Sequence, residues 1–172
     1  GHGGLPETER AAVNVVDAWG VPGNLPVDPA TYLSEWGLPV LHLDPQGGLS
    51  QSYIATDAWF EGAPYSAQMK IRGASSAGYP KNSFTVEFEP TQIDLRDQGL
   101  GRKDHLVLVS NFDDAAYVRQ RMVFEVWQEM TDFRGADRLT PRTAWVVLYL
   151  DGEYFGLYTA MDHIDDEFVG EQ

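Results

Sequence analysis

The chain has 172 residues, 43 % of them hydrophobic, which suits one folded domain with a real core and excludes an intrinsically disordered protein. Acidic residues outnumber basic ones by 26 to 12, and the resulting net charge of −14 argues against general binding to nucleic acid or to an anionic membrane. There is no cysteine, which excludes disulfides, thiolate metal sites and a cysteine nucleophile, and no apolar run has membrane-spanning length.

The first 37 residues differ in pattern from the rest, and we expect an N-terminal extension at residues 1–37 and the main portion at residues 38–172. Residues 7–19 have the apolar spacing of a short helix, and the proline- and glycine-rich residues 20–29 predict a loop. Asp28 precedes a proline, which is favoured at the first helical position. A second short helix is therefore predicted to end near Trp36.

From residue 38 onward the sequence predicts β-strands. Apolar or alternating runs closed by turn residues place them at residues 39–43, 52–60, 65–72, 83–88 and 106–109. In the third of these strands, Ala67 and Met69 point to one face of the sheet while Lys70 and Arg72 point to the other. Lys81 shares the polar parity of the next strand, so it belongs on the same polar face if that strand starts early.

The last two strands form a predicted β-hairpin. Residues 144–150 and residues 153–161 both have strand patterns. Asp151 and Gly152 between them suit a two-residue turn, which needs positive φ at both central residues.

A long helix is predicted at residues 115–130, after a polar stretch that suits a helix start. Arg119 falls at the centre of its apolar stripe, so it must pair with a carboxylate or phosphate, or reach out past the helix start. Glu125 and Glu129 lie beside the stripe, where they are either solvated or face a basic partner. The stripe itself comprises Met122, Val123, Val126, Trp127 and Met130. Together these patterns predict an α+β fold: a mostly antiparallel sheet of five to seven strands with this helix packed on one face.

A stretch without acidic residues, from residue 62 to residue 86, is the clearest functional signal. Its only charged residues are Lys70, Arg72 and Lys81, which flank or follow a loop rich in glycine and serine. Backbone N–H groups of such loops bind phosphate oxygens, and nearby cations supply the charge. The alternative is a solvated hairpin whose charges protect a sheet edge.

Other catalytic patterns are weak or absent. Residues 162–168 contain a histidine and several carboxylates, but their spacing matches no zinc or EF-hand pattern. We therefore favour an acidic helix start there and predict no metal site. The four histidines are scattered and pair with no obvious nucleophile, so a hydrolase triad is not supported.

Four segments in one order resemble the spore-coat CotH kinase family. Residues 72–84 resemble its R-G-x-S-S-x-x-[FY]-P-K-x-[SP]-[FY] segment, and residues 111–119 resemble its N-x-x-D…R-N helix start. Residues 148–158 resemble its L-Y-[LV]-N-G-E-Y-x-G-x-Y hairpin, and residues 162–165 its E-x-I-D segment. The resemblance covers about residues 39–168 and implies the N-terminal part of a kinase-like domain.

The resemblance implies a secreted, atypical protein kinase that transfers the γ-phosphoryl group of ATP to serine with Mg²⁺. It implies that the glycine and serine loop covers the nucleotide, that Arg72 and Lys81 reach phosphate oxygens, and by analogy that Glu125 holds Lys81. The candidate nucleotide-binding residues are Arg72, Gly73, Ser75, Ser76, Lys81, Arg119 and Glu125.

The sequence also departs from the family pattern. The metal-binding aspartates of the family lie well after its E-x-I-D segment, and no P-W-D-x-D segment is present here. We therefore expect a nucleotide-facing N-terminal portion that is inactive alone, with catalytic residues unassigned, and with ATP and Mg²⁺ as implied cofactors. The family suggests an extracellular, cell-surface or spore-surface location, although no signal-peptide pattern is visible.

Two other functions compete with the kinase interpretation. One is a non-catalytic surface or adhesion module that keeps the fold and binds a protein partner. The other is a carbohydrate-binding β-domain, which is disfavoured because Trp127 fits the core side of the predicted helix. We also expect possible self-association, because a face that a second lobe would cover is otherwise exposed.

Overall fold

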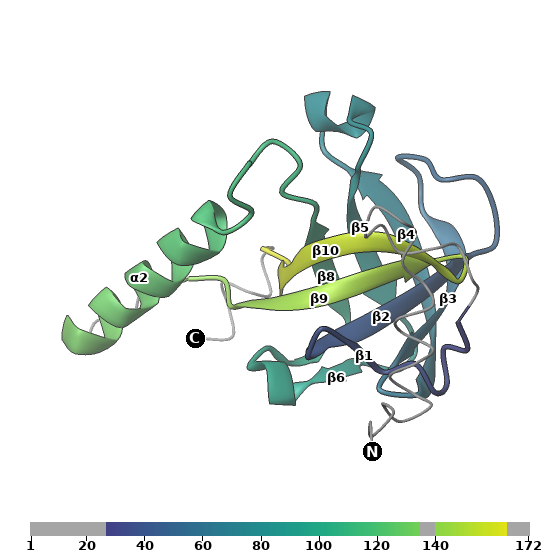
Figure 1. The fold of residues 1–172 in the computed structure, drawn as a ribbon, viewed down its shortest axis with the longest axis horizontal. Coiled ribbons are helices and arrows are strands. Elements are labelled where there is room, and N and C mark those ends of the chain that lie inside the picture. Colours follow the sequence, from purple (N-terminus) through teal and green to yellow (C-terminus); the bar gives the residue numbers. More distant parts are fainter. Residues whose placement is uncertain (1–26, 135–139, 165–172) are drawn as a thin grey trace, which may run out of the picture.

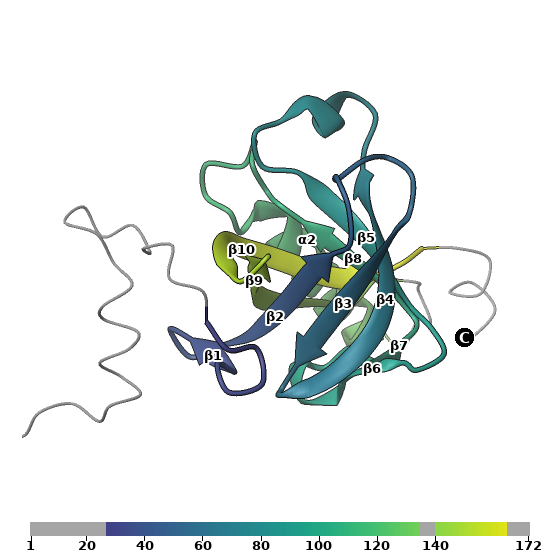
Figure 2. The same cartoon turned by 90° about the vertical axis from the view of Figure 1, so that its right-hand side faces the viewer.

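The computed structural model of the chain describes residues 27–134 and 140–164 (Figures 1 and 2). The helix predicted at residues 7–19 and the last part of the acidic run at 162–168 lie outside these described residues. The strands are β1 (Ser34–Glu35), β2 (Leu38–Pro45), β3 (Ile54–Phe60), β4 (Ala63–Arg72), β5 (Ser83–Phe88), β6 (Ile93–Leu95), β7 (Gly101–Lys103), β8 (His105–Val109), β9 (Thr143–Leu150) and β10 (Glu153–Asp162). The helical elements are the 3₁₀ turns η1 (Ser75–Gly78) and η2 (Arg96–Gln98) and the α-helix α2 (Arg119–Arg134).

Seven of the strands close into a barrel. The order β2-β3-β4-β5-β8-β10-β9 is antiparallel throughout, and β9 returns to pair with β2 in parallel. That closing contact sets Val40 opposite Val147 and Leu43 opposite Leu150. Because the last strand of the sheet pairs with the first, these seven strands leave no open edge of the sheet.

The hydrophobic core fills the inside of the barrel. Alternate residues of each strand point inward, as the period of two requires. The fully buried side chains come from every barrel strand and include Leu41, Phe60, Met69, Phe84, Val86, Leu108, Leu148 and Tyr158.

One end of the barrel is closed by a small hairpin that the sequence did not predict. The sequence patterns predict no strand between residues 88 and 106, yet residues 89–103 contain β6 and β7. Three apolar side chains of this segment are at most 1 % exposed and join the barrel core: Ile93, Leu95 and Leu100. Three isolated apolar residues among polar neighbours give too short a pattern to be recognised as strands.

The predicted α+β fold is wrong. The strands form a closed barrel, and the only α-helix among the described residues projects from it (Figure 1). The expected layer of helix on sheet fails because a closed barrel buries its apolar face inside itself, so no open sheet face is left for a helix. The stripe on α2 is exposed as a result, with Val123 at 65 % and Trp127 at 42 %.

Local predictions fared better than the overall architecture. The predicted hairpin is confirmed as β9 and β10, and its turn residues Asp151 and Gly152 have φ values of 52° and 76°. The predicted barrel strands are present with shifted ends. The short helix predicted after Asp28 is wrong: the backbone makes one turn there, with Tyr32 N donating to Asp28 O, and continues into β1.

The segment before β2 packs against the outside of the barrel. Tyr32 lies over Tyr149 with ring centroids 5.4 Å apart, and the Tyr149 hydroxyl donates a hydrogen bond of 2.8 Å to Glu35. Burial raises the pKa of the Glu35 carboxyl above its ordinary value, and the bond from Tyr149 opposes that rise. Residues 27–37 thus pack on the barrel through these contacts.

Candidate functional site

Lys81 lies where the segment before β5 meets β10. Its Nζ donates a 2.7 Å hydrogen bond to the backbone oxygen of Leu157. The same Nζ lies 4.6 Å from the ring centre of Tyr158 and 5.2 Å from that of Tyr117. The electron-rich ring faces stabilise the ammonium group, so three elements far apart in sequence converge on one cation.

A glycine makes room for this lysine. Gly156 follows a β-bulge in β10 and has φ of 130°, a conformation that other residues rarely adopt. A Cβ atom at this position would lie 2.9 Å from Lys81 Nζ and 3.1 Å from Lys81 Cε. Gly156 is therefore required twice, once for its backbone conformation and once for the space beside the lysine.

Burial changes the acidity of Lys81. The removal of water from its ammonium group lowers the pKa of Lys81 to about 8. No carboxylate among the described residues forms an ion pair with it. An ammonium group has three N–H donors and only one is used by Leu157, so Lys81 has donors and charge to offer an anion.

The glycine and serine loop ahead of Lys81 has a fixed shape. Gly73 has φ of 109°, and a Cβ atom there would lie 2.0 Å from the Ser76 hydroxyl. Gln51 donates to the Gly73 backbone oxygen at 2.7 Å. The Asn82 side chain donates hydrogen bonds to the backbone oxygens of Ala77 and Tyr79, which fixes the C-terminal end of the loop. The loop is thus held at both ends while its residues 73–75 are exposed.

A second loop, residues 110–118, forms the other wall of the site. The buried Asn111 side chain donates to the Thr159 hydroxyl at 2.8 Å, which ties this loop to β10. Phe112 packs against Tyr79 of the first loop with ring centroids 5.4 Å apart. Tyr117, in the same loop, is thereby placed with its ring beside the Lys81 ammonium group.

Asp114 determines where α2 begins. Its two carboxylate oxygens accept hydrogen bonds from the backbone N–H groups of Ala116 at 3.0 Å and Arg119 at 2.9 Å. The helix therefore starts at Arg119 rather than at the predicted residue 115. The N-x-x-D pattern in this chain thus has a clear structural role, with Asn111 anchoring the loop and Asp114 capping the helix.

The structure brings some predicted site residues together and separates others. Gly73, Ser75 and Ser76 belong to the loop that leads into Lys81, as described above. Arg72 is exposed at the end of β4. The remaining candidates lie away from this cluster.

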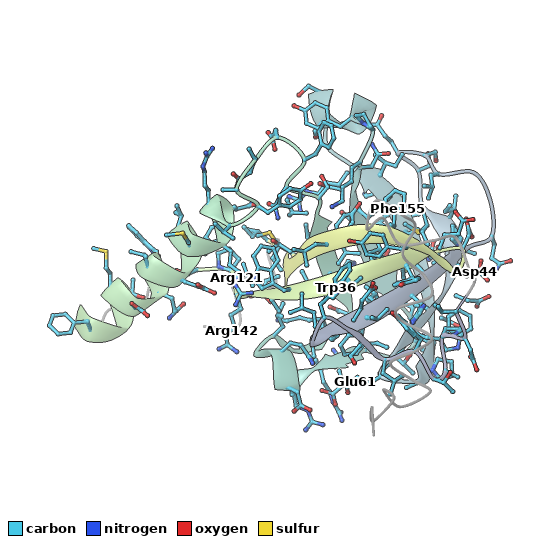
Figure 3. The ribbon with its side chains drawn as sticks, in the orientation of Figure 1. Trp36, Asp44, Glu61, Arg121, Arg142 and Phe155 are labelled. Carbon is cyan, nitrogen blue, oxygen red and sulfur yellow. The ribbon has the colours of Figure 1, made fainter. Side chains whose placement is uncertain are left out.

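Arg119 and Glu125 have other partners on α2. The Arg119 side chain is 72 % exposed and lies 3.4 Å from Asp114, so it is not buried in an apolar stripe. Glu125 pairs with Arg121, whose guanidinium lies 5.2 Å from the ring centre of Trp145. Figure 3 shows Arg121 between α2 and the barrel. The structure does not bring Glu125 to Lys81.

Three contributors to the site escaped the sequence reasoning: Tyr117, Gly156 and Tyr158. The last two belong to the hairpin motif, and their spacing of two residues was visible in the sequence. The bulge before Gly156 and the approach of Lys81 were not visible, because Lys81 and Leu157 are 76 residues apart. Tyr117 has φ of 59° in the second loop and carried no sequence signal.

The described residues offer no metal centre. No group of three or more His, Asp or Glu side chains in this part of the chain is placed to hold a metal ion. Asp162 is already engaged, with one carboxylate oxygen 2.8 Å from Lys103 Nζ and the other accepting from Arg142 N. The described side chains therefore suit a phosphate beside Lys81, and they do not supply a ligand set for Mg²⁺.

An open hollow of about 850 Å³ lies beside the β6–β7 hairpin, at the end of β5 that is farther from Lys81. It is lined by Glu89, Asp94 and Asp104, and its arginine, Arg102, already contacts Asp94 at 3.5 Å. Its carboxylates disfavour a phosphate, so volume alone is a poor guide here. The Lys81 cluster is the better candidate for an anion.

The geometry defines a closed β-barrel domain with a basic, glycine-containing loop and a half-buried lysine at one end. A comparison with family models matches residues 69–172 to the family described as CotH kinase protein. The chain belongs to the CotH kinase family, and the resemblance seen in its sequence motifs is confirmed. A comparison with curated proteins finds no match.

The matched region begins inside β4 and contains the Lys81 loop, the Asn111 loop and the β9–β10 hairpin. The contacts around Lys81 therefore all lie within it, apart from the bond from Gln51 to Gly73. Across the described residues, no helix combines the length and hydrophobicity that crossing a membrane requires.

Proposed function

We propose that this chain is the nucleotide-facing portion of a CotH-type protein kinase domain, in which the loop at residues 73–82 and Lys81 bind the phosphates of ATP. The observation that supports this most directly is the state of Lys81. Its ammonium group is half buried, lacks a carboxylate partner among the described residues, and has unused N–H donors beside a shaped, exposed loop.

A phosphate beside Lys81 would stabilise its charged form. Burial disfavours the ammonium and lowers the pKa of Lys81, whereas a nearby anion favours the ammonium and raises that pKa again. Tyr117 and Tyr158 fix the direction of the side chain, so little rotamer entropy is lost when the anion binds. Phosphoryl transfer depends on such positioning and charge stabilisation.

The loop at residues 73–82 has the second role in this proposal. Gly73 fixes its turn, and the exposed Ser75 supplies a hydroxyl donor next to it. In the family, Mg²⁺ supplies additional charge neutralisation when it is bound. We assign neither a metal ligand nor a catalytic base within residues 27–134 and 140–164, and we therefore expect slow or absent transfer from this chain alone.

Calorimetric titration with ATP, in the presence and absence of Mg²⁺, tests the proposal. We expect weak binding that Lys81→Ala reduces by at least about tenfold, since a charge-assisted phosphate contact contributes about 1.5–3 kcal/mol. Lys70→Ala is the matched control. It removes the same positive charge, but Lys70 lies on the outside of β4 against the ring of Tyr53. Equal affinities of the Lys81→Ala variant and the unmodified chain would remove Lys81 from the site.

The family also suggests an association with the spore coat, and we propose an extracellular or surface location with a protein as phosphoryl acceptor. A non-catalytic surface module is the second candidate, and the exposed apolar side of α2 favours it. The two functions separate in one measurement. Absence of ATP binding both in this chain and in any longer natural form would favour the surface module.

A further inference from the structure

The apolar side of α2 does not contribute to the core. Figure 1 shows the helix projecting from the barrel, and its large apolar side chains are strongly exposed. Those side chains, with their exposed fractions, are Met122 at 55 %, Val123 at 65 %, Val126 at 51 %, Trp127 at 42 %, Met130 at 47 % and Phe133 at 93 %. Large exposed apolar patches on soluble proteins mark interaction sites.

The opposite side of the helix is the one that faces the barrel. Arg121 packs over the ring of Trp145 in β9. Phe124 lines a hollow shared with Pro141 and Thr143 at the start of β9. The helix is therefore already placed by one side, and the exposed side is left for a partner.

The spacing on the exposed side is that of a helix-pairing seam. Val123, Val126, Met130 and Phe133 follow one another at intervals of three, four and three residues. This alternation keeps a stripe facing a second helix in coiled-coil packing. Val126, Met130 and Phe133, together with Glu129, line an open hollow of about 530 Å³ on this side of the helix.

The charged residues beside the seam favour a second copy of the same helix as the partner. Arg119 is exposed at the beginning of the helix, and Glu129 is exposed near its end. An antiparallel copy of the same helix would place Glu129 of one chain near Arg119 of the other, twice by symmetry.

We propose that this side of α2 is a self-association surface, through which two copies of the chain pair with their α2 helices antiparallel. The seam contributes apolar burial, and the opposite charges of Arg119 and Glu129 favour the antiparallel orientation. The proposal is independent of nucleotide binding, because Lys81 and its loop are not part of the seam.

Analytical ultracentrifugation of the 172-residue chain over a range of concentrations tests it. We expect a monomer–dimer equilibrium that Val126→Glu weakens by at least about tenfold, because two symmetric carboxylates would enter the apolar seam. Since Val126 is exposed in the monomer, circular dichroism should show an unchanged fold. Ile164→Glu is the matched control, because Ile164 is 56 % exposed and lies outside α2.

Charge reversal tests the antiparallel arrangement. Arg119→Glu alone and Glu129→Arg alone should each weaken the dimer by about three- to tenfold, and the double reversal should restore it. A mixture of the two single variants should form a mixed dimer. A chain that stays monomeric at about 0.1 mM, a dimer insensitive to Val126→Glu, or no recovery in the double variant would overturn the proposal.

Discussion

The Lys81 cluster and the exposed side of α2 show opposite departures from ordinary burial. At the first, a cation is held against aromatic rings in a half-buried place. At the second, Val126 and Phe133 remain exposed on a helix. The first region is determined by contacts within the chain, whereas the second has the spacing and charge of a surface that another chain completes. Mutations should therefore act on folding in one region and on association in the other.

The strongest test of this contrast is Gly156→Val. We expect a loss of about 2–4 kcal/mol in the free energy of unfolding, because a β-branched residue is strained at φ of 130° and its Cβ would contact Lys81. Urea denaturation measures the loss. Gly47→Ala is the control glycine, because a Cβ atom there meets nothing within 4 Å. Similar stabilities of the two variants would show that the contacts around Lys81 can rearrange to accept a side chain at position 156.

The pH dependence of stability tests the burial of Lys81. Its pKa is lowered from 10.5 to about 8 in the folded chain, so between these values the unfolded state binds the extra proton. The free energy of unfolding should therefore rise as the pH increases from about 8 to 10.5, by about 1 kcal/mol after allowance for the partial exposure of the amine. Denaturation at several pH values measures this rise.

Lys81→Met should remove this rise, because methionine has no titrating group. Lys70→Met, on the outside of β4, serves as the control and should keep the rise. If the variant without Lys81 and the unmodified chain showed the same pH profile, another group would be responsible.

The smallest effect is expected on α2. Val126→Ser, measured at a concentration where the chain is monomeric, should change the free energy of unfolding by no more than about 0.5 kcal/mol, because the side chain is exposed. The matched position Val86, which is fully buried in the barrel, should lose about 2 kcal/mol or more with the same substitution. Thermal unfolding of both variants compares them, and a large effect at Val126 would show that this side of the helix supports the monomer.

Sequence reasoning recovered what depends on near neighbours. Asp151 and Gly152 specify their turn locally, and alternation in β4 correctly indicated that Ala67 and Met69 face the core. It failed on the parallel pairing of β2 with β9, because strand alternation shows which side is apolar but not whether a sheet closes on itself. It also placed the apolar stripe of α2 in the core, since an amphipathic pattern looks the same whatever covers it.

The same limit applies to the site. The charge gap and the loop residues pointed to Lys81, which the structure places in a well-defined cluster. The hypothesis that Glu125 pairs with Lys81 came from analogy with ordinary kinases. In this chain Glu125 pairs with Arg121 instead. The contacts that do define Lys81, from Tyr117 and from the carbonyl of Leu157, depend on tertiary structure that no short motif contains.

The pairing of β2 with β9 has a practical consequence for choosing fragments of this protein. The family match starts at residue 69, yet β2 and β3 lie before it and complete the ring of strands. A fragment cut at residue 69 would expose the hydrogen-bonding groups of β4 and β9 and would empty part of the interior now filled by Leu41 and Phe60. Such open edges promote aggregation, so the smallest useful expression unit must retain the strands that precede the family match.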